Sequence, residues 1–223
     1  MSGSGERRRL VGAKADLLRM TRLLPHQAAL CIAPASMIEP PFLPDRSIVL
    51  VGLMGAGKTT VGRRLARRLE LPFVDSDEEI ERAADHSISE MFDRYGEASF
   101  RDGERRVIAR LIRGAPKVIA TGGGAFVDEA TRALILERCL SIWLDADLDT
   151  LAERVTRRDT RPLLRDREPI AVLRELSSRR APLYAQAHLR IHTLPSPHER
   201  IVDQVIEALR GWNPALIPQN RSG

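Results

Sequence analysis

The sequence Gly-Leu-Met-Gly-Ala-Gly-Lys-Thr at residues 52–59 decides how the rest of the chain is interpreted. It follows a short apolar run, residues 47–51, that is typical of a buried parallel strand. It precedes residues 60–69, whose apolar side chains recur on one helical face. The pattern G-x-x-x-x-G-K-[ST] between a strand and a helix predicts a loop that binds nucleotide phosphates. The alternative, a glycine-rich turn that contains Lys and Thr by chance, is disfavoured by the flanking elements.

Each residue type in this loop has a chemical reason to be there. Glycines let the backbone N–H groups approach phosphate oxygens, and the positive end of the next helix adds to the attraction. We expect Lys58 to reach the β- and γ-phosphates and the hydroxyl of Thr59 to hold Mg²⁺. The loop residues predicted to bind ATP are Gly55, Ala56, Gly57, Lys58, Thr59 and Thr60.

The composition of the 223 residues is ordinary for a globular protein, with 43% hydrophobic and 29% charged residues. No apolar run approaches the length of a membrane span, so we expect no membrane association. The net charge of +5 suits nucleic acid and anionic small substrates equally well. Cys31 and Cys139 show no metal-ligand spacing, which predicts a reducing cytoplasm and no disulfide framework.

The first 46 residues differ from the rest of the chain, because they are basic at the start and rich in proline toward the end. We expect residues 1–46 to be a flexible extension. A targeting segment, or a true start at Met20 or Met37, are the alternatives. The remaining chain is expected to form one domain, residues 47–210, followed by a C-terminal tail, residues 211–223.

Two carboxylates follow the second predicted strand, residues 71–74, in the sequence Asp-Ser-Asp at 75–77. Ligands of open α/β sheets bind outside the carboxyl ends of the strands. One carboxylate at this position can join a Mg²⁺ shell, and the other can meet a substrate hydroxyl. The alternative is that Asp77 caps the following helix.

Two short helices are predicted next, at residues 78–85 and 87–95, and a further helix with Arg101 on its first turn runs to about Gly114. The first turn of a helix is an unfavourable place for a cation. This position suggests that Arg101 meets a ligand, such as a carboxylate held by two parallel hydrogen bonds. The alternative is a surface ion pair with Glu97 or Glu104.

The third predicted strand, residues 117–121, runs into three consecutive glycines at residues 122–124. Such a cluster indicates that the backbone passes very close to another group, and a bare flexible turn is the alternative. Further strands are predicted at residues 139–144 and 189–193. A helix before the last strand is expected to end or kink at Pro182.

In their order, these motifs resemble the shikimate kinase family over about residues 47–209. The family's motifs in this chain are the phosphate loop, Asp-Ser-Asp at 75–77, Phe-Arg at 100–101, Gly-Gly-Gly-Ala at 122–125, Arg-Pro-Leu-Leu at 161–164 and Arg-Arg-Ala-Pro-Leu-Tyr at 179–184. The resemblance implies an α/β P-loop NTPase fold, a nucleoside-monophosphate-kinase-like three-layer sandwich with a mobile lid. Its five-stranded parallel sheet has the order 2-3-1-4-5. The implied reaction transfers the γ-phosphate of ATP to the 3-hydroxyl of shikimate, in chorismate and aromatic amino acid biosynthesis.

The resemblance also implies roles for single residues. Lys58, Asp77 and Arg161 are the implied catalytic residues, where Asp77 contacts the shikimate hydroxyls and Arg161 lies on a lid at about residues 155–168. Thr59 and Asp75 belong to the magnesium shell. Arg154 and Pro197 lie beside the adenine. A substrate-binding region is implied at about residues 76–104. The implied shikimate-binding residues are Asp77 and Arg101 within it, and Gly122, Gly123, Gly124 and Arg180 beyond it.

Two other functions are open at this point. A gluconate or nucleoside-monophosphate kinase would share the phosphate loop and the lid, but it gives no reason for Arg101, Gly123 and Arg180 to accompany Asp77. A nucleotide-gated nucleic-acid-binding protein would use the positive charge, but aromatic residues are only 4% of the chain. We therefore expect ATP and shikimate as partners, no nucleic acid, and the monomeric state that the family suggests.

Overall fold

The computed structural model describes residues 45–156, 168–193 and 196–212. Within them, five parallel strands form one sheet in the order β2-β3-β1-β4-β5. The predicted order 2-3-1-4-5 is therefore confirmed. The strands are β1 Ile48–Val51, β2 Phe73–Asp75, β3 Val118–Ala120, β4 Leu140–Ala146 and β5 Leu189–Thr193.

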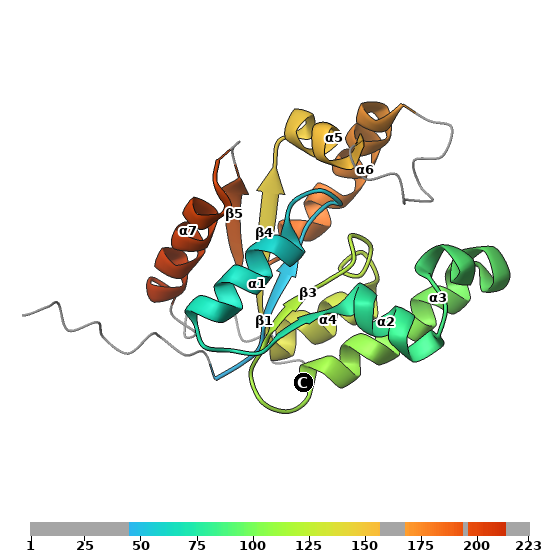
Figure 1. Ribbon diagram of the computed structural model, residues 1–223, viewed down its shortest axis with the longest axis horizontal. Helices are drawn as coiled ribbons and strands as arrows, with labels where there is room; N and C mark the ends of the chain where they lie inside the picture. The colour runs from blue at the N-terminus through green and yellow to red at the C-terminus, as the bar shows by residue number, and fades with distance from the viewer. Residues whose placement is uncertain (1–44, 157–167, 194–195, 213–223) are drawn as a thin grey trace, which may run out of the picture. The chain divides into compact units, whose positions relative to one another are not determined.

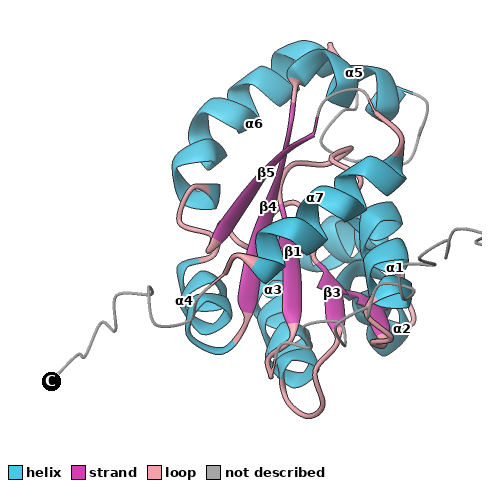
Figure 2. Cartoon of the chain, turned by 90° about the vertical axis from the view of Figure 1, so that its left-hand side faces the viewer, coloured by secondary structure: helices cyan, strands magenta, loops and turns pink. Residues whose placement is uncertain are grey.

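Helices cover both faces of this sheet, as the two views show (Figures 1 and 2). Helices α1 and α7 pack against each other on one face, and α3 and α4 pack against each other on the opposite face. The helices are α1 Lys58–Arg68, α2 Ser76–Ala84, α3 Ile88–Ile112, α4 Glu129–Arg138, α5 Leu148–Thr156, α6 Pro169–Tyr184 and α7 His198–Arg210. The predicted α/β three-layer architecture is thus confirmed.

Strand β1 is the centre of the core. All four of its residues are buried, because β3 and β4 pair with its two edges and helices cover its two faces. Its start is fixed by the pairing of Ile48 with Val118 on one side and with Leu140 on the other. A strand buried in this way must be apolar along its whole length, which explains the unbroken run in the sequence. The central strand therefore holds the loop at residues 52–59 on a rigid support.

The helices predicted at residues 87–95 and up to about residue 114 are the two segments of α3, which meet at a kink. Helix α3 contains a single non-helical residue, Gly96, with φ 73° and ψ 170°. These angles are accessible almost only to glycine. Arg101 lies a full turn beyond this kink, so the prediction that it occupies the first turn of a helix near residue 100 is wrong. A small apolar cluster of Ile80, Met91 and Phe100 joins α2 to α3.

Helix α6 differs from its prediction at Pro182. Helix α6 continues past Pro182 to Tyr184, so the prediction that the proline ends it is wrong. Pro182 lacks the backbone N–H for one hydrogen bond of this last turn, and the turn ends at the buried Tyr184. No helix among the described residues is long and apolar enough to cross a membrane. Residues 1–44, 213–223 and 157–167, which include Arg161 of the predicted lid, lie outside the described residues.

Candidate active site

The phosphate loop connects β1 to α1 as predicted. Helix α1 begins at Lys58, and its N-cap residue is Gly57, with φ 89° in the left-handed region that glycine tolerates. No side chain caps the helix, so its first backbone N–H groups are left without a side-chain acceptor. A helix N-terminus of this kind attracts anions, which is the local geometry that a phosphate site requires.

Lys58 is folded back over its own loop. Its Nζ atom donates hydrogen bonds of 2.9 Å to the carbonyl oxygens of Gly52 and Leu53, and the residue is buried. The cation is therefore held at the mouth of the loop, where an incoming phosphate would meet it.

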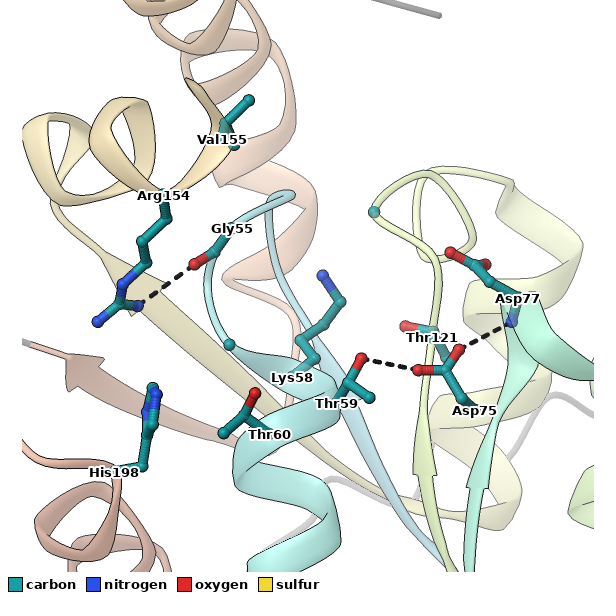
Figure 3. Close-up of a pocket in the computed structure, with 12 residues that line it drawn as sticks. Gly55, Lys58, Thr59, Thr60, Asp75, Asp77, Thr121, Arg154, Val155 and His198 are labelled. Carbon is teal, nitrogen blue, oxygen red and sulfur yellow. Dashed lines mark hydrogen bonds between the residues drawn. The ribbon is translucent and has the colours of Figure 1, made fainter. Parts of the chain in front are cut away.

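Asp75 at the end of β2 joins two parts of the site. Its Oδ2 atom accepts a hydrogen bond of 2.7 Å from the hydroxyl of Thr59, and its Oδ1 atom accepts one of 3.0 Å from the backbone N–H of Asp77. Asp75 is thus the N-cap of α2, and the alternative that Asp77 caps this helix is wrong. The side chain of Asp77 lines the cavity at the start of the helix (Figure 3).

The glycines after β3 are tightly packed, which contradicts the alternative of a bare turn. A Cβ atom at Gly122 would lie 2.5 Å from Oδ1 of Asp77. A Cβ atom at Gly124 would lie 2.5 Å from both terminal nitrogens of Arg101. The loop can therefore carry no side chain at these positions without displacing the aspartate or the arginine.

Arg101 is paired with two carboxylates and also faces the glycine loop. Its Nη1 atom lies 2.6 Å from Glu104, and its Nη2 atom lies 3.3 Å from Glu97, so both predicted alternative ion pairs are present. Glu104 is only 2% exposed. Burial raises the pKa of Glu104 despite the nearby guanidinium. Burial disfavours the charge of Arg101, but the Glu104 carboxylate outweighs it and raises the pKa of Arg101. The arginine therefore remains a fixed cation beside the glycine loop.

Helix α6 reaches the same loop from the other side. The carbonyl oxygen of Gly123 accepts hydrogen bonds from Nη1 of Arg180, at 3.0 Å, and from the hydroxyl of Tyr184. The Tyr184 ring lies between Phe126 and Trp143, which fixes its position. Two arginines from different helices thus converge on residues 123–124.

A cavity of about 440 Å³ connects the phosphate loop to Asp77 (Figure 3). Lys58 stands between its two ends, with Asp75 and Asp77 on one side and Arg154 and His198 on the other. Nη1 of Arg154 donates a hydrogen bond of 3.3 Å to the carbonyl of Gly55, which ties α5 to the loop. The lining residues are Gly55, Gly57, Lys58, Thr59, Thr60, Asp75, Asp77, Thr121, Gly123, Arg154, Val155 and His198.

Most of the predicted site residues are thus gathered at the carboxyl edge of the sheet. His198, the first residue of α7, lines the cavity, and its neighbour Pro197 is exposed; the role of Pro197 beside the adenine stays a prediction. The sequence analysis assigned no site role to Thr121, Val155 or His198, although each is adjacent to a predicted residue. Tyr184 was also missed as a support of Gly123. Glu104 was named only as an alternative partner of Arg101, although its pairing with Arg101 is compatible with Arg101 facing the glycine loop.

Comparison with known proteins agrees with this geometry. The family model "Shikimate kinase" matches residues 54–210. The shikimate kinase of Zymomonas mobilis is 57% identical over 174 residues, which cover 78% of this chain and 99% of that protein. The shikimate kinase of Caulobacter vibrioides is 56% identical over 165 residues, which cover 74% of this chain and 82% of that protein.

Solved structures give the same result. The shikimate kinase from Acinetobacter baumannii in complex with shikimate has a TM-score of 0.73 and 38% sequence identity, and covers 76% of this chain and 96% of its own. A gluconokinase from Sinorhizobium meliloti, with a TM-score of 0.51 and 18% identity over 75% of this chain and 93% of its own, shares the fold alone. The matched residues include the phosphate loop from Met54 onward and every other residue that lines the cavity. By sequence and by structure, this chain belongs to the shikimate kinase family.

Proposed function

We propose that this protein transfers the γ-phosphoryl group of ATP to the 3-hydroxyl of shikimate, which gives shikimate 3-phosphate and ADP for the synthesis of chorismate and aromatic amino acids. The observation that carries the proposal is the shared cavity between the phosphate loop and Asp77, with Arg101 and Arg180 converging on the glycine loop at its edge. The end at the phosphate loop suits a triphosphate, and the end at Asp77 and the two arginines suits a hydroxylated carboxylic acid.

In this proposal, catalysis consists of positioning and charge neutralisation. Lys58 leaves the carbonyls of Gly52 and Leu53 to meet the phosphate oxygens, and Arg161 adds a second cation from the lid. Asp77 orients the acceptor hydroxyl in line with the γ-phosphorus and takes its proton as the new O–P bond forms. The bond from the γ-phosphorus to ADP breaks, and ADP leaves with its charge neutralised.

The oxygens of Thr59 and Asp75 suit Mg²⁺, because they are hard ligands that already lie 2.7 Å apart. Among the described residues, no three His, Cys, Asp or Glu side chains form a metal site by themselves. We therefore propose that Thr59 and Asp75 share the ion with phosphate oxygens and water. When bound, Mg²⁺ supplies positive charge that offsets the developing charge on the phosphates.

The acid substrate is assigned to the other end of the cavity. Arg101 and Arg180 would hold its carboxylate, and Asp77 would hold its hydroxyls. The glycines at residues 122–124 would let the ring approach the backbone. At the nucleotide end, Arg154 and Pro197 are proposed neighbours of the adenine, where the contact of Arg154 with Gly55 supports the first assignment.

We also propose that the protein works as a monomer in the cytoplasm and binds no nucleic acid. The sequence contains only two cysteines. Burial raises the pKa of the Cys139 thiol to about 12, which keeps this thiol protonated and unreactive. The low aromatic content supports the absence of a base-stacking surface.

The test is release of ADP from MgATP by the purified protein with shikimate, and separately with gluconate and with AMP. We expect turnover with shikimate alone. Turnover with gluconate or AMP but not with shikimate would overturn the proposal. The variant Lys58→Ala is the inactive control, and Arg101→Ala should raise the KM for shikimate while leaving the KM for ATP unchanged. An unchanged KM for shikimate in Arg101→Ala would refute the carboxylate assignment.

A further inference from the structure

The carbonyl oxygen of Gly123 accepts both of its side-chain hydrogen bonds from α6, one from Nη1 of Arg180 at 3.0 Å and one from the hydroxyl of Tyr184. A carbonyl oxygen has two lone pairs, so these two donors use its full capacity. A Cβ atom built at Gly123 would lie 3.3 Å from the backbone nitrogen of Met54, at the start of the phosphate loop. Gly123 therefore contacts both α6 and the phosphate loop, and it lines the cavity between them and Asp77.

The three glycines at residues 122–124 differ in what holds their carbonyls. The carbonyls of Gly122 and Gly124 accept backbone hydrogen bonds from the N–H groups of Ala125 and Val127, whereas the carbonyl of Gly123 is held by the two side chains of α6. Consecutive glycines have wide backbone freedom, and no side chain of their own limits how a peptide plane is turned. The orientation of the peptide group between residues 123 and 124 consequently depends on donors from another element.

The same peptide group carries the N–H of Gly124. A trans peptide is planar, so its N–H points opposite to its C=O, and no cis bond occurs in the described ranges. Because the carbonyl of Gly123 points to α6, the N–H of Gly124 points away from α6. Within the described part of the chain, this N–H donates no hydrogen bond. Arg101 lies directly beside Gly124, so a backbone donor and a guanidinium are adjacent there.

Of the two donors to Gly123, Tyr184 is the one that packing fixes. It is only 1% exposed, and its ring centroid lies 6.4 Å from that of Phe126 and 5.9 Å from that of Trp143. Burial raises the pKa of Tyr184, although Arg180 and Arg101 oppose this effect, so the hydroxyl stays a donor at neutral pH. Arg180 is half-buried, and the proposed function requires its guanidinium to hold a carboxylate as well. A phenylalanine would fill the same apolar space, so the hydroxyl serves the carbonyl.

We propose that Tyr184 is a positioning residue for the acid substrate. Through the carbonyl of Gly123, its hydroxyl fixes the N–H of Gly124 and the guanidinium of Arg180 in the directions from which they bind this substrate. The inference rests on the proposed function for the identity of the acid. Tyr184 itself takes no part in the chemical step, and the nucleotide end of the cavity does not depend on it.

The first test uses Tyr184→Phe, which removes the hydroxyl and keeps the ring. We expect the Kd and the KM for shikimate to rise about five- to tenfold, while the KM for ATP stays within about twofold of wild type. The control is Ser141→Ala, which removes a fully buried hydroxyl that contacts His188 and does not line the cavity. Both variants should have a lower Tm, but the control should change neither KM.

The outcomes separate this inference from the proposed function. Wild-type protein that fails to bind shikimate would overturn the proposed function. Wild-type binding together with an unchanged Kd in Tyr184→Phe, or an equal rise of both KM values, would overturn the role of Tyr184 alone.

A second measurement needs no substrate. Two glycines are adjacent in the sequence only within residues 122–124. Protein made with glycine that carries ¹³C at the carbonyl and ¹⁵N at the amide therefore gives carbonyl-to-amide signals only from the peptide bonds 122–123 and 123–124. In Tyr184→Phe, we expect one of these signals, from the bond 123–124, to shift or broaden far more than the other. Two signals that stay at their wild-type positions would refute the proposal, whatever the acid substrate is.

Discussion

At the scale of single residues, Asp75 combines two roles that one substitution can separate. Its carboxylate caps α2 through the N–H of Asp77 and accepts the hydroxyl of Thr59. Asparagine caps helices about as well as aspartate, but it lacks the charge that attracts a cation. In Asp75→Asn, we expect an almost unchanged Tm, a turnover at least about tenfold lower, and a higher Mg²⁺ concentration for half-maximal activity. Thermal unfolding and a Mg²⁺ titration measure these effects.

Asp128 provides the matched control for this prediction. It caps α4 by accepting the N–H of Thr131, and it does not line the cavity. Asp128→Asn should therefore leave the Mg²⁺ dependence of the reaction unchanged. A Mg²⁺ dependence that is the same in Asp75→Asn and wild type would show that Asp75 is only a helix cap.

Glu104 leads to a prediction about pH. Its pKa is raised in the folded protein, so the native state holds its proton at pH values where the unfolded chain has lost it. Stability therefore falls as the pH rises from the ordinary value of 4.5 through the raised native pKa. Glu104→Gln removes this loss of stability at higher pH. We therefore expect the Tm of the variant minus the Tm of wild type to increase from pH 4 to pH 8. The KM for shikimate should rise about tenfold, because Arg101 loses its buried partner. A Tm difference that decreases toward pH 8 would contradict this account.

At the scale of elements, α3 contains two glycines whose substitution should have opposite effects. Gly96 forms the kink, whereas Gly103 lies in the helix beyond it, and a Cβ atom at either position meets nothing within 4 Å. Gly96→Ala should lower the free energy of unfolding by about 1–3 kcal/mol through backbone strain. Gly103→Ala should raise it by up to about 1 kcal/mol through helix propensity. Urea unfolding measures both changes.

The same pair tests whether the kink positions Arg101. Gly96→Ala should raise the KM for shikimate, because the helix that carries Arg101 would be redirected, while Gly103→Ala should leave it nearly unchanged. Equal effects of the two substitutions on this KM would show that the kink does not position the arginine.

Elements were largely predictable from the sequence, because buried strands and amphipathic helices leave periodic patterns. Strand β5 was predicted with its observed bounds, and β1 within one residue. The two helical segments of α3 were also predicted, on either side of Gly96, but the second begins directly after this glycine and not near Arg101. His198 and Val155 escaped notice for a different reason. They meet the phosphate loop only because the sheet order places α5 and α7 beside it, and no local pattern contains that information.

At the scale of the whole molecule, the strand order came from the family resemblance, since periodicity alone cannot rank five parallel strands. The described residues that line the cavity all lie between Gly55 and His198, and the family match begins at Met54. We therefore expect a protein that lacks residues 1–44 to keep the KM values for ATP and shikimate, the turnover and the Tm of the full chain. Steady-state kinetics and thermal unfolding of both forms measure this. A change in either KM would show that the predicted extension takes part in substrate binding.

The position of β1 between β3 and β4 also has a consequence for synthesis on the ribosome. Its first residue, Ile48, pairs with Val118 and with Leu140, so its second neighbour is made long after it. At about 5–20 residues per second, that interval lasts roughly 5–20 s. Throughout it, an apolar strand that is fully buried in the finished protein has an open edge. The loop that follows β1 is thus the first part of the active site to be synthesised and among the last to gain its support.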